Sequence, residues 1–254
     1  MPSLLPLILM ALACAGSPVM AAEKARPYVE QIPRPDMMRV LPPPPAPGSP
    51  ADQDDRATFR ETRKLAGGDR WMVATRDVTD GPFISFACAM GLQLSPASAP
   101  ALARIFDRMG GGLLINPVKQ GYARRRPYLN DDLPICEPKT DHLASNGDYP
   151  SGHTTSGWST ALVLAELLPE RATPLLARGR AFGESRFICG SHSKSAVEAG
   201  YLSGASLVAM LHASPEFRRD MEAARAELKR LGKAAPRPSP SQCALEAKAL
   251  DMNF

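Results

Sequence analysis

Three short segments of the sequence gather the residue types that bind and transfer a phosphoryl group. Lys119-x6-Arg126-Pro127 supplies two cations. Pro150-Ser151-Gly152-His153 supplies a turn of small residues and an imidazole, and Ser185-Arg186-x5-His192 supplies a third cation and a second imidazole. Phosphoryl transfer requires positive charge around the phosphate oxygens, a nucleophile in line with the leaving oxygen, and an acid that protonates that oxygen. The three segments contain these parts without a metal ion.

The second and third segments each have a simpler structural interpretation as well. Ser151 and Gly152 precede a strong helical pattern, where unpaired amides and the helix dipole favour an anion. Ser151 could equally be only an N-cap, and His153 a surface residue of the first turn. His192 follows the chain break at Gly190, where an imidazole can face a pocket or simply cap a helix. Both interpretations stay open for each segment alone.

The first segment is ambiguous in the same way. Lys119 and Arg126 lie seven residues apart, so they share one face if the segment is helical. Because Arg124 and Arg125 lie between them, a solvated basic turn is the simpler interpretation. The joint presence of the three segments, in this order and at this spacing, is what makes the pattern specific.

In combination the segments resemble the three-part signature of the type 2 phosphatidic acid phosphatase (PAP2)/haloperoxidase superfamily, and within it the bacterial class A non-specific acid phosphatases. The flanking residues are similar too: Tyr149 before the second segment, and Phe182-Gly183-Glu184 and Ile188-Cys189-Gly190 around the third. The similarity extends roughly from Asp69 to Leu231. It implies an all-α globular helical bundle and an acid phosphatase that hydrolyses phosphate monoesters, with no cofactor and no metal.

The resemblance also assigns roles to individual residues. His192 matches the nucleophile that forms a phosphohistidine. His153 matches the general acid that protonates the leaving alcohol, after which water attacks the phosphoenzyme. The residues that match the phosphate-binding cradle are Lys119, Arg126, Ser151, Gly152 and Arg186.

One position departs from the family pattern. The family has an aspartate four residues after the nucleophilic histidine, where it orients the ring, and this chain has Ala196. Glu198 is the nearest acid, but it lies about 200° around a helix from position 196. We expect it to form a capping box with Ser195 instead. Ser193 is also unusual, since an aromatic residue is expected there.

The departure at Ala196 leaves alternatives for the function. The first prediction is an acid phosphatase slowed by the missing carboxylate, in which Ala196→Asp should raise turnover by at least about tenfold. The second is a catalytically impaired relative that binds phosphate or a phosphorylated partner. The third is a vanadate-dependent haloperoxidase, whose cofactor occupies the same cradle in related proteins. Release of phosphate from p-nitrophenyl phosphate separates the first two.

Composition and the N-terminal segment limit where the protein acts and what it binds. The 254 residues have a formal charge of +4, and the Lys and Arg residues are scattered, which argues against nucleic-acid binding. The apolar run from Leu4 to Ala15 is too short to span a membrane. With the small residues up to Ala22 it predicts a signal peptide and a periplasmic or secreted protein. We expect small phosphate monoesters and inorganic phosphate as ligands, and leave open whether the chain forms a homo-oligomer.

Four cysteines remain after the signal peptide, an even number in an exported protein. None has the Cys-x2-Cys spacing of a structural zinc site. Three pairings are possible, and free thiols are the alternative. We expect Cys136 to pair with Cys189, since both lie near the three segments in sequence, and Cys88 to pair with Cys243, which would anchor the tail.

The chain divides into a signal peptide (1–21), a proline-rich extended arm (22–50), a helical phosphatase domain (51–233) and a frayed tail (234–254). Nine prolines between Pro27 and Pro50 predict extended, partly polyproline II backbone, either a spacer or an arm laid over the domain. Gly110-Gly111-Gly112 predicts a flexible loop. No stretch alternates as a strand does. The expected helices cover residues 52–66, 69–78, 83–92, 99–109, 154–168, 170–185, 195–212 and 215–231.

Overall fold

The structure is a computed structural model that describes residues 26–251, and the expected signal peptide over 1–21 lies outside them. Within the described residues the fold is all-α, with no strand, as predicted. The α-helices are α1 (Met37–Val40), α2 (Pro50–Arg63), α3 (Asp69–Thr79), α4 (Pro82–Ser85), α5 (Ala87–Met90), α6 (Pro100–Arg108), α7 (Gly111–Tyr122), α8 (Asp141–Ser145), α9 (Gly152–Leu167), α10 (Ala172–Cys189), α11 (Lys194–Leu211), α12 (Pro215–Leu231) and α13 (Pro240–Leu250). The 3₁₀ helices are η1 (Tyr28–Gln31), η2 (Pro127–Leu129), η3 (Pro169–Arg171) and η4 (Gly232–Ala234).

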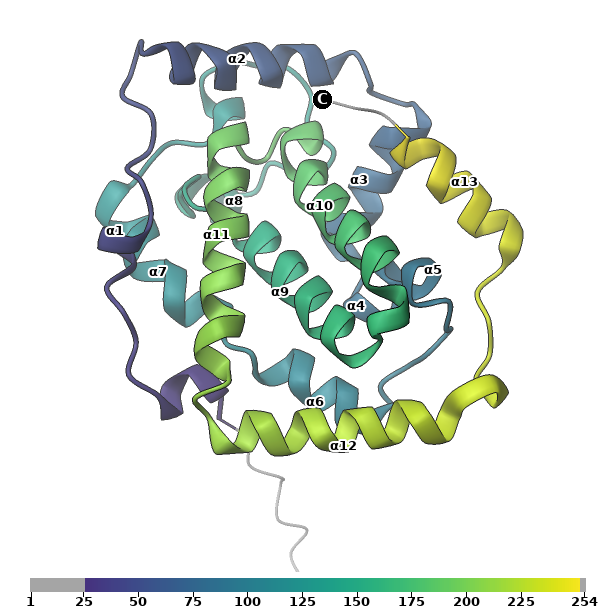
Figure 1. The fold of residues 1–254 in the computed structure, drawn as a ribbon. Helices are drawn as coiled ribbons and strands as arrows, with labels where there is room; N and C mark the ends of the chain where they lie inside the picture. Colours follow the sequence, from purple (N-terminus) through teal and green to yellow (C-terminus); the bar gives the residue numbers. More distant parts are fainter. Residues whose placement is uncertain (1–25, 252–254) are drawn as a thin grey trace, which may run out of the picture.

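Helices α9, α10 and α11 form the centre of the fold, with α2 across one end and α12 across the other (Figure 1). Small residues let α9 and α10 approach closely. A Cβ on Gly157 would lie 2.2 Å from the ring of Phe182, and one on Gly179 would lie 2.3 Å from the Cβ of Ala161. Any side chain at these two glycines would therefore push the central helices apart.

The proline-rich arm lies over the domain. Tyr28 is fully buried, packs edge to face on Phe217 with ring centroids 5.4 Å apart, and donates a 2.5 Å hydrogen bond to Asp220. Further along, the carbonyl of Pro42 accepts a 2.5 Å hydrogen bond from the hydroxyl of Tyr149. The arm is extended between these points but contains the short helices η1 and α1, which the proline content had argued against. Both helices fall in stretches that lack prolines, so no proline ring clashes with the helical backbone there.

The described part of the C-terminal tail, up to residue 251, is not frayed, contrary to the sequence-based expectation. It forms α13, which begins at Pro240 and lies beside α3 (Figure 1). The predicted disulfide between Cys88 and Cys243 is present, and Glu246 pairs with Arg178 at 3.3 Å. Tertiary contacts therefore stabilise a helix whose own sequence pattern is weak.

Two other boundaries differ from the prediction. Only Gly110 forms the expected turn, with φ of 77°, and α7 starts at Gly111. Gly110 is needed because a Cβ there would lie 2.5 Å from Val29 of the arm. The apolar stretch 83–92 breaks at Phe86 into α4 and α5 rather than forming one helix. Among the helices in the described part of the chain, none is both long and apolar enough to cross a bilayer.

The tail disulfide gives a test of stability. Replacing both cysteines (Cys88→Ser with Cys243→Ser) should lower the free energy of unfolding by about 2–4 kcal/mol, because the crosslink restricts a long loop in the unfolded chain. The two cysteines lie 155 residues apart. Urea unfolding followed by circular dichroism measures the change. An unaltered midpoint would show that packing and the Glu246 ion pair alone hold α13.

Candidate active site

The second and third segments meet because α9 and α10 are antiparallel neighbours. Only η3 connects the end of α9 to the start of α10, so the start of α9 and the end of α10 lie at the same end of the pair (Figure 1). Residues 190–193 alone separate α10 from α11, so α11 starts at that end too. Ser151 caps α9, Arg186 lies in the last turn of α10, and His192 lies between α10 and α11.

The first segment reaches the same place from α7. Lys119 lies in the last turn of α7 and donates a hydrogen bond to the carbonyl of Gly147. Arg126 follows the helix and donates 2.7 Å hydrogen bonds to the carbonyls of Asn146 and Ser191. The helix ends at Tyr122, so a shared helical face is not what brings the two cations together. Both are buried, at 7% and 3% exposed.

Burial of these cations makes the site strongly electropositive. Burial, followed by the neighbouring charge of Arg126, lowers the pKa of Lys119 to about 8. Burial is also the main reason that the pKa of Arg126 is lowered. A buried cation is destabilised when no anion compensates for its lost hydration. The site therefore favours a bound anion.

Arg186 has side-chain donors available for such an anion. Its side chain is fully buried, and Nη2 pairs with Glu137 at 2.5 Å. Its Nε and Nη1 atoms have no hydrogen-bond partner among the described residues. Buried polar groups are nearly always partnered, and a guanidinium presents its donors in a fork that fits phosphate oxygens. Two unsatisfied donors on one fork make Arg186 a candidate ligand for an oxyanion.

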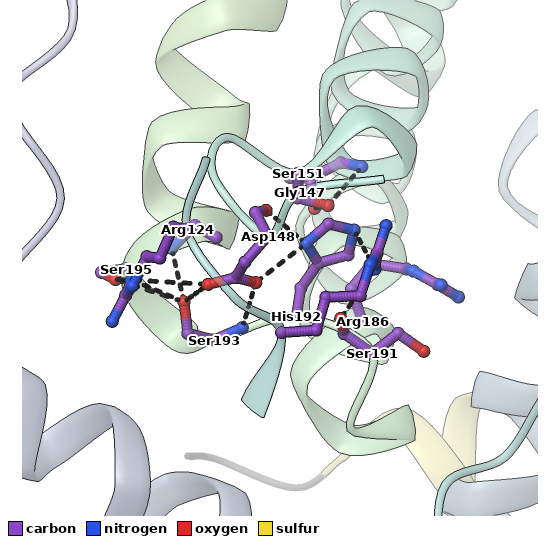
Figure 2. Close-up of polar contacts among 12 residues, drawn as sticks. Arg124, Gly147, Asp148, Ser151, Arg186, Ser191, His192, Ser193 and Ser195 are labelled. Carbon is purple, nitrogen blue, oxygen red and sulfur yellow. Dashed lines mark hydrogen bonds and ion pairs between the residues drawn. The ribbon is translucent and has the colours of Figure 1, made fainter. Parts of the chain in front are cut away.

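His192 is held as a neutral ring with a defined tautomer. Its Nε2 lies 3.0 Å from Nη1 of Arg126, which can only donate, so Nε2 accepts and bears no proton. The proton is then on Nδ1, which faces the backbone carbonyl of Asp148 at 2.6 Å (Figure 2). Burial and the adjacent positive charges hold the pKa of His192 well below its ordinary value. The Nε2 lone pair is therefore available on the side of the cations.

His153 is more open to solvent than His192. It is exposed, lies in the first turn of α9, and lines a cavity of about 220 Å³ with Phe106 and Phe182. The positive charge of Arg186 is the main factor that lowers the pKa of His153, and Glu137 opposes it. A bound dianion would cancel the effect of Arg186, so His153 gains a proton more readily when phosphate is present.

Ser151 and Gly152, both expected in the phosphate-binding cradle, lie at the start of α9 with different hydrogen bonds. The Ser151 hydroxyl accepts from the Thr154 amide at 3.3 Å and caps α9, and the Ser151 amide donates to the carbonyl of Ala196 at 2.9 Å. Gly152 is the first residue of α9, where no helical carbonyl can accept its amide proton. The amides free for an anion are thus those at the start of α9, in line with the helix dipole.

Three further residues of the site were not predicted from the sequence. Glu137 pairs with Arg186, and the predicted disulfide between Cys136 and Cys189 is present and holds it there. Asp148 contacts His192, and Arg124 pairs with Asp148 at 3.4 Å. The expected pairing of Cys136 was a signal for Glu137, because it places the next residue beside the third segment. No spacing in the sequence pointed to Asp148.

One alternative interpretation and one expectation about this region were wrong. Arg124 does not belong to a solvated turn, because its side chain is 16% exposed and pairs with Asp55 at 2.8 Å. Ser195 and Glu198 do not form the capping box. The N-cap of α11 is Ser193, whose hydroxyl accepts from the amide of Ala196, and Ser195 bonds to Asp55 instead. The physical reason is that α11 starts at Lys194, one residue earlier than predicted.

Comparison with known proteins identifies similar sequences. The protein-family model described as the PAP2 superfamily matches residues 101–220. An acid phosphatase of Zymomonas mobilis is 42% identical over 220 residues, which cover 84% of this chain and 83% of that protein. A non-specific acid phosphatase of Providencia stuartii is 36% identical, covering 78% and 83%. One of Salmonella typhimurium is 34% identical, covering 82% and 86%.

The unsatisfied donors of Arg186 predict an effect on anion binding. Arg186→Gln should weaken binding of inorganic phosphate at least about tenfold, because two charge-assisted hydrogen bonds are lost. Isothermal titration calorimetry measures the affinity. Arg180→Gln is the matched control, since Arg180 lies on the same helix, is exposed, and pairs only with Glu184 among the described residues. Equal phosphate affinity in the Arg186 variant and the wild type would contradict the assignment.

Proposed function

The chain belongs to the acid phosphatases of the PAP2 superfamily, and we propose that it hydrolyses small phosphate monoesters through a phosphohistidine on His192. The main support is the pair of buried donors on Arg186, Nε and Nη1. Neither has a hydrogen-bond partner among the described residues, and both could donate to a phosphate oxygen. Lys119 and Arg126 add positive charge near His192, and together with Arg186 they lower the pKa of its ring. The similarity to curated acid phosphatases supports the same substrate class.

In the first step, Nε2 of His192 attacks the phosphorus atom. A bond forms between nitrogen and phosphorus while the bond to the leaving oxygen breaks, and His153 donates its proton to that oxygen. Lys119, Arg126 and Arg186 stabilise the charge on the three equatorial oxygens. The neutral tautomer of His192 suits this role, because its lone pair is on Nε2 and no deprotonation is required.

In the second step, water releases the phosphate. His153, now neutral, accepts a proton from the water as its oxygen attacks phosphorus, and the bond to Nε2 breaks. His192 returns to its neutral form, inorganic phosphate leaves, and His153 is protonated for the next cycle. Acid favours the protonated form of His153, and the strongly lowered pKa of His192 keeps that ring neutral. Since Arg186 lowers the pKa of His153 in the free enzyme, the acid form becomes populated as pH falls or as a phosphate dianion binds.

The location that fits this protein is the periplasm or the medium. The two disulfides, Cys88–Cys243 and Cys136–Cys189, are stable in an oxidising compartment. The second one positions Glu137 against Arg186, so reduction would disturb the phosphate site directly. Export by the N-terminal apolar segment would bring the chain to a compartment where both disulfides persist.

The two histidines should respond differently to substitution. His192→Asn should abolish turnover and the covalent intermediate. His153→Asn should lower turnover by about 10²–10⁴-fold on an alkyl phosphate. The loss should be smaller on p-nitrophenyl phosphate, whose leaving group needs little protonation. Steady-state rates and trapping of ³²P on the protein in an alkaline denaturing quench measure these effects.

His212→Asn is the control for these variants, since His212 is exposed and pairs with Glu166 far along the chain from the three segments. It should retain full activity. Labelled protein recovered from the His192→Asn variant would show that another residue is the nucleophile.

Phosphatase activity should survive chelators and be inhibited by vanadate. The charge on the phosphate is balanced by Lys119, Arg126 and Arg186. Within the described residues, no group of three His, Cys, Asp or Glu side chains could hold a metal ion. Rates before and after EDTA dialysis, and vanadate titration, are the measurements. Loss of activity in EDTA that zinc or magnesium restores would refute the cradle mechanism.

A further inference from the structure

The Nδ1 atom of His192 faces two acceptors that belong to one residue. The backbone carbonyl of Asp148 is 2.6 Å away, and Oδ1 of its carboxylate is 3.1 Å away (Figure 2). Both residues are buried, with Asp148 fully inaccessible to solvent. Asp148 lies just before the second segment, so it reaches the ring from the loop that leads into α9.

The polar neighbours of Asp148 favour an ionised carboxylate. Oδ1 accepts from the amide of Ser193 at 3.0 Å as well as facing Nδ1 of His192, and Oδ2 accepts from the Ser193 hydroxyl at 2.6 Å. Arg124 pairs with Oδ2 at 3.4 Å. All of these groups donate to the carboxylate. Burial raises the pKa of Asp148, and the charge of Arg124 and the hydrogen bonds from Ser193 oppose that effect. The fixed negative charge therefore lies directly behind the imidazole.

Two unusual residues of the third segment fit this arrangement. Ser193 is small and polar where an aromatic side chain was expected, and it holds both oxygens of Asp148. Ala196 replaces the expected aspartate, and its buried methyl group offers no acceptor. Position 196 lacks the carboxylate that the resemblance implies, and Asp148 places one beside Nδ1 of His192.

We propose that Asp148 is the positioning residue of His192, supplying from the α9 side the carboxylate that position 196 lacks. The proposal rests on the phosphatase function proposed above. When Nε2 attacks phosphorus, the ring becomes positively charged while its proton stays on Nδ1. The backbone carbonyl fixes the tautomer, but only the carboxylate supplies a full negative charge to stabilise that cation in a buried site.

The proposal revises the expectation for Ala196. An increase in turnover on Ala196→Asp depends on His192 lacking a carboxylate partner, and Asp148 is such a partner. A second carboxylate beside a buried first one raises the pKa of the pair and weakens the charge available to the ring. Ala196→Asp alone should therefore leave turnover unchanged or lower it.

The test moves the carboxylate from position 148 to position 196. Asp148→Asn should lower kcat at least about tenfold while KM changes less than about threefold, because Lys119, Arg126 and Arg186 still bind the phosphate. Asp148→Asn combined with Ala196→Asp should recover most of the lost kcat. Rates on p-nitrophenyl phosphate, together with the thermal midpoint of each variant, are the measurements.

Asp55→Asn is the matched control. Asp55 is a buried carboxylate in the same network, bonded to Arg124 and Ser195, but it does not contact His192 among the described residues. If Asp148 acts on stability alone, the Asp55→Asn and Asp148→Asn variants should lose thermal stability and activity equally, with both KM and kcat changed. This result would overturn the proposal.

The remaining outcomes separate the proposal from the function on which it rests. A rise in turnover of tenfold or more in Ala196→Asp alone would overturn the role of Asp148, whether or not Asp148→Asn folds. Normal kcat in a folded Asp148→Asn variant would do the same. If the wild type forms no phosphoenzyme and releases no phosphate, the phosphatase function itself fails, and the comparison of variants does not arise.

Discussion

The whole site depends on three buried cations that lack enough negative charge. Lys119, Arg126 and Arg186 surround one space, and the only carboxylate within hydrogen-bonding distance of them in the described part of the chain is Glu137. Backbone carbonyls satisfy most of the other donors, but two on Arg186 remain unsatisfied. Such an arrangement is unfavourable in an empty site and favourable around a phosphate, so the rest of the fold must hold it together before the substrate arrives.

The fold meets this requirement by bringing the start of α9, the end of α10 and the start of α11 together at one place. The short connection between α9 and α10 fixes them as antiparallel neighbours, and the glycines at 157 and 179 allow the close approach that sets their relative position. The disulfide between Cys136 and Cys189 ties the loop bearing Glu137 to the end of α10. α2 covers the far side through Asp55 and Arg124, so the residues behind His192 are themselves buried and partnered.

Sequence patterns predicted the parts of this structure that local physics determines. The all-α fold and the helices α3, α6, α9, α11 and α12 (within two residues at each end) follow from periodicity and glycine stops. Cysteine parity predicted two disulfides, and the correct pairing was chosen from the nearness of Cys136 and Cys189 to the site segments and from the position of Cys243 in the tail. What failed depends on contacts between distant segments. The tail helix α13 is stabilised by a disulfide and by the ion pair with Arg178. Gly110, just before α7, packs against Val29 of the arm. Asp148 contacts His192 because the loop before α9 folds onto that ring.

Asp148 shows why a motif is an incomplete description of a site. The imidazole needs a negative charge at one point in space, on the Nδ1 side, and the field at that point does not depend on which backbone segment provides it. The segments that carry residues 148 and 196 are adjacent, since the Ser151 amide bonds to the Ala196 carbonyl and holds the start of α9 against the start of α11. A carboxylate on either segment can therefore face the ring. A departure from the family pattern at position 196 is thus an argument for impaired catalysis only after the neighbouring segments have been searched for the missing charge.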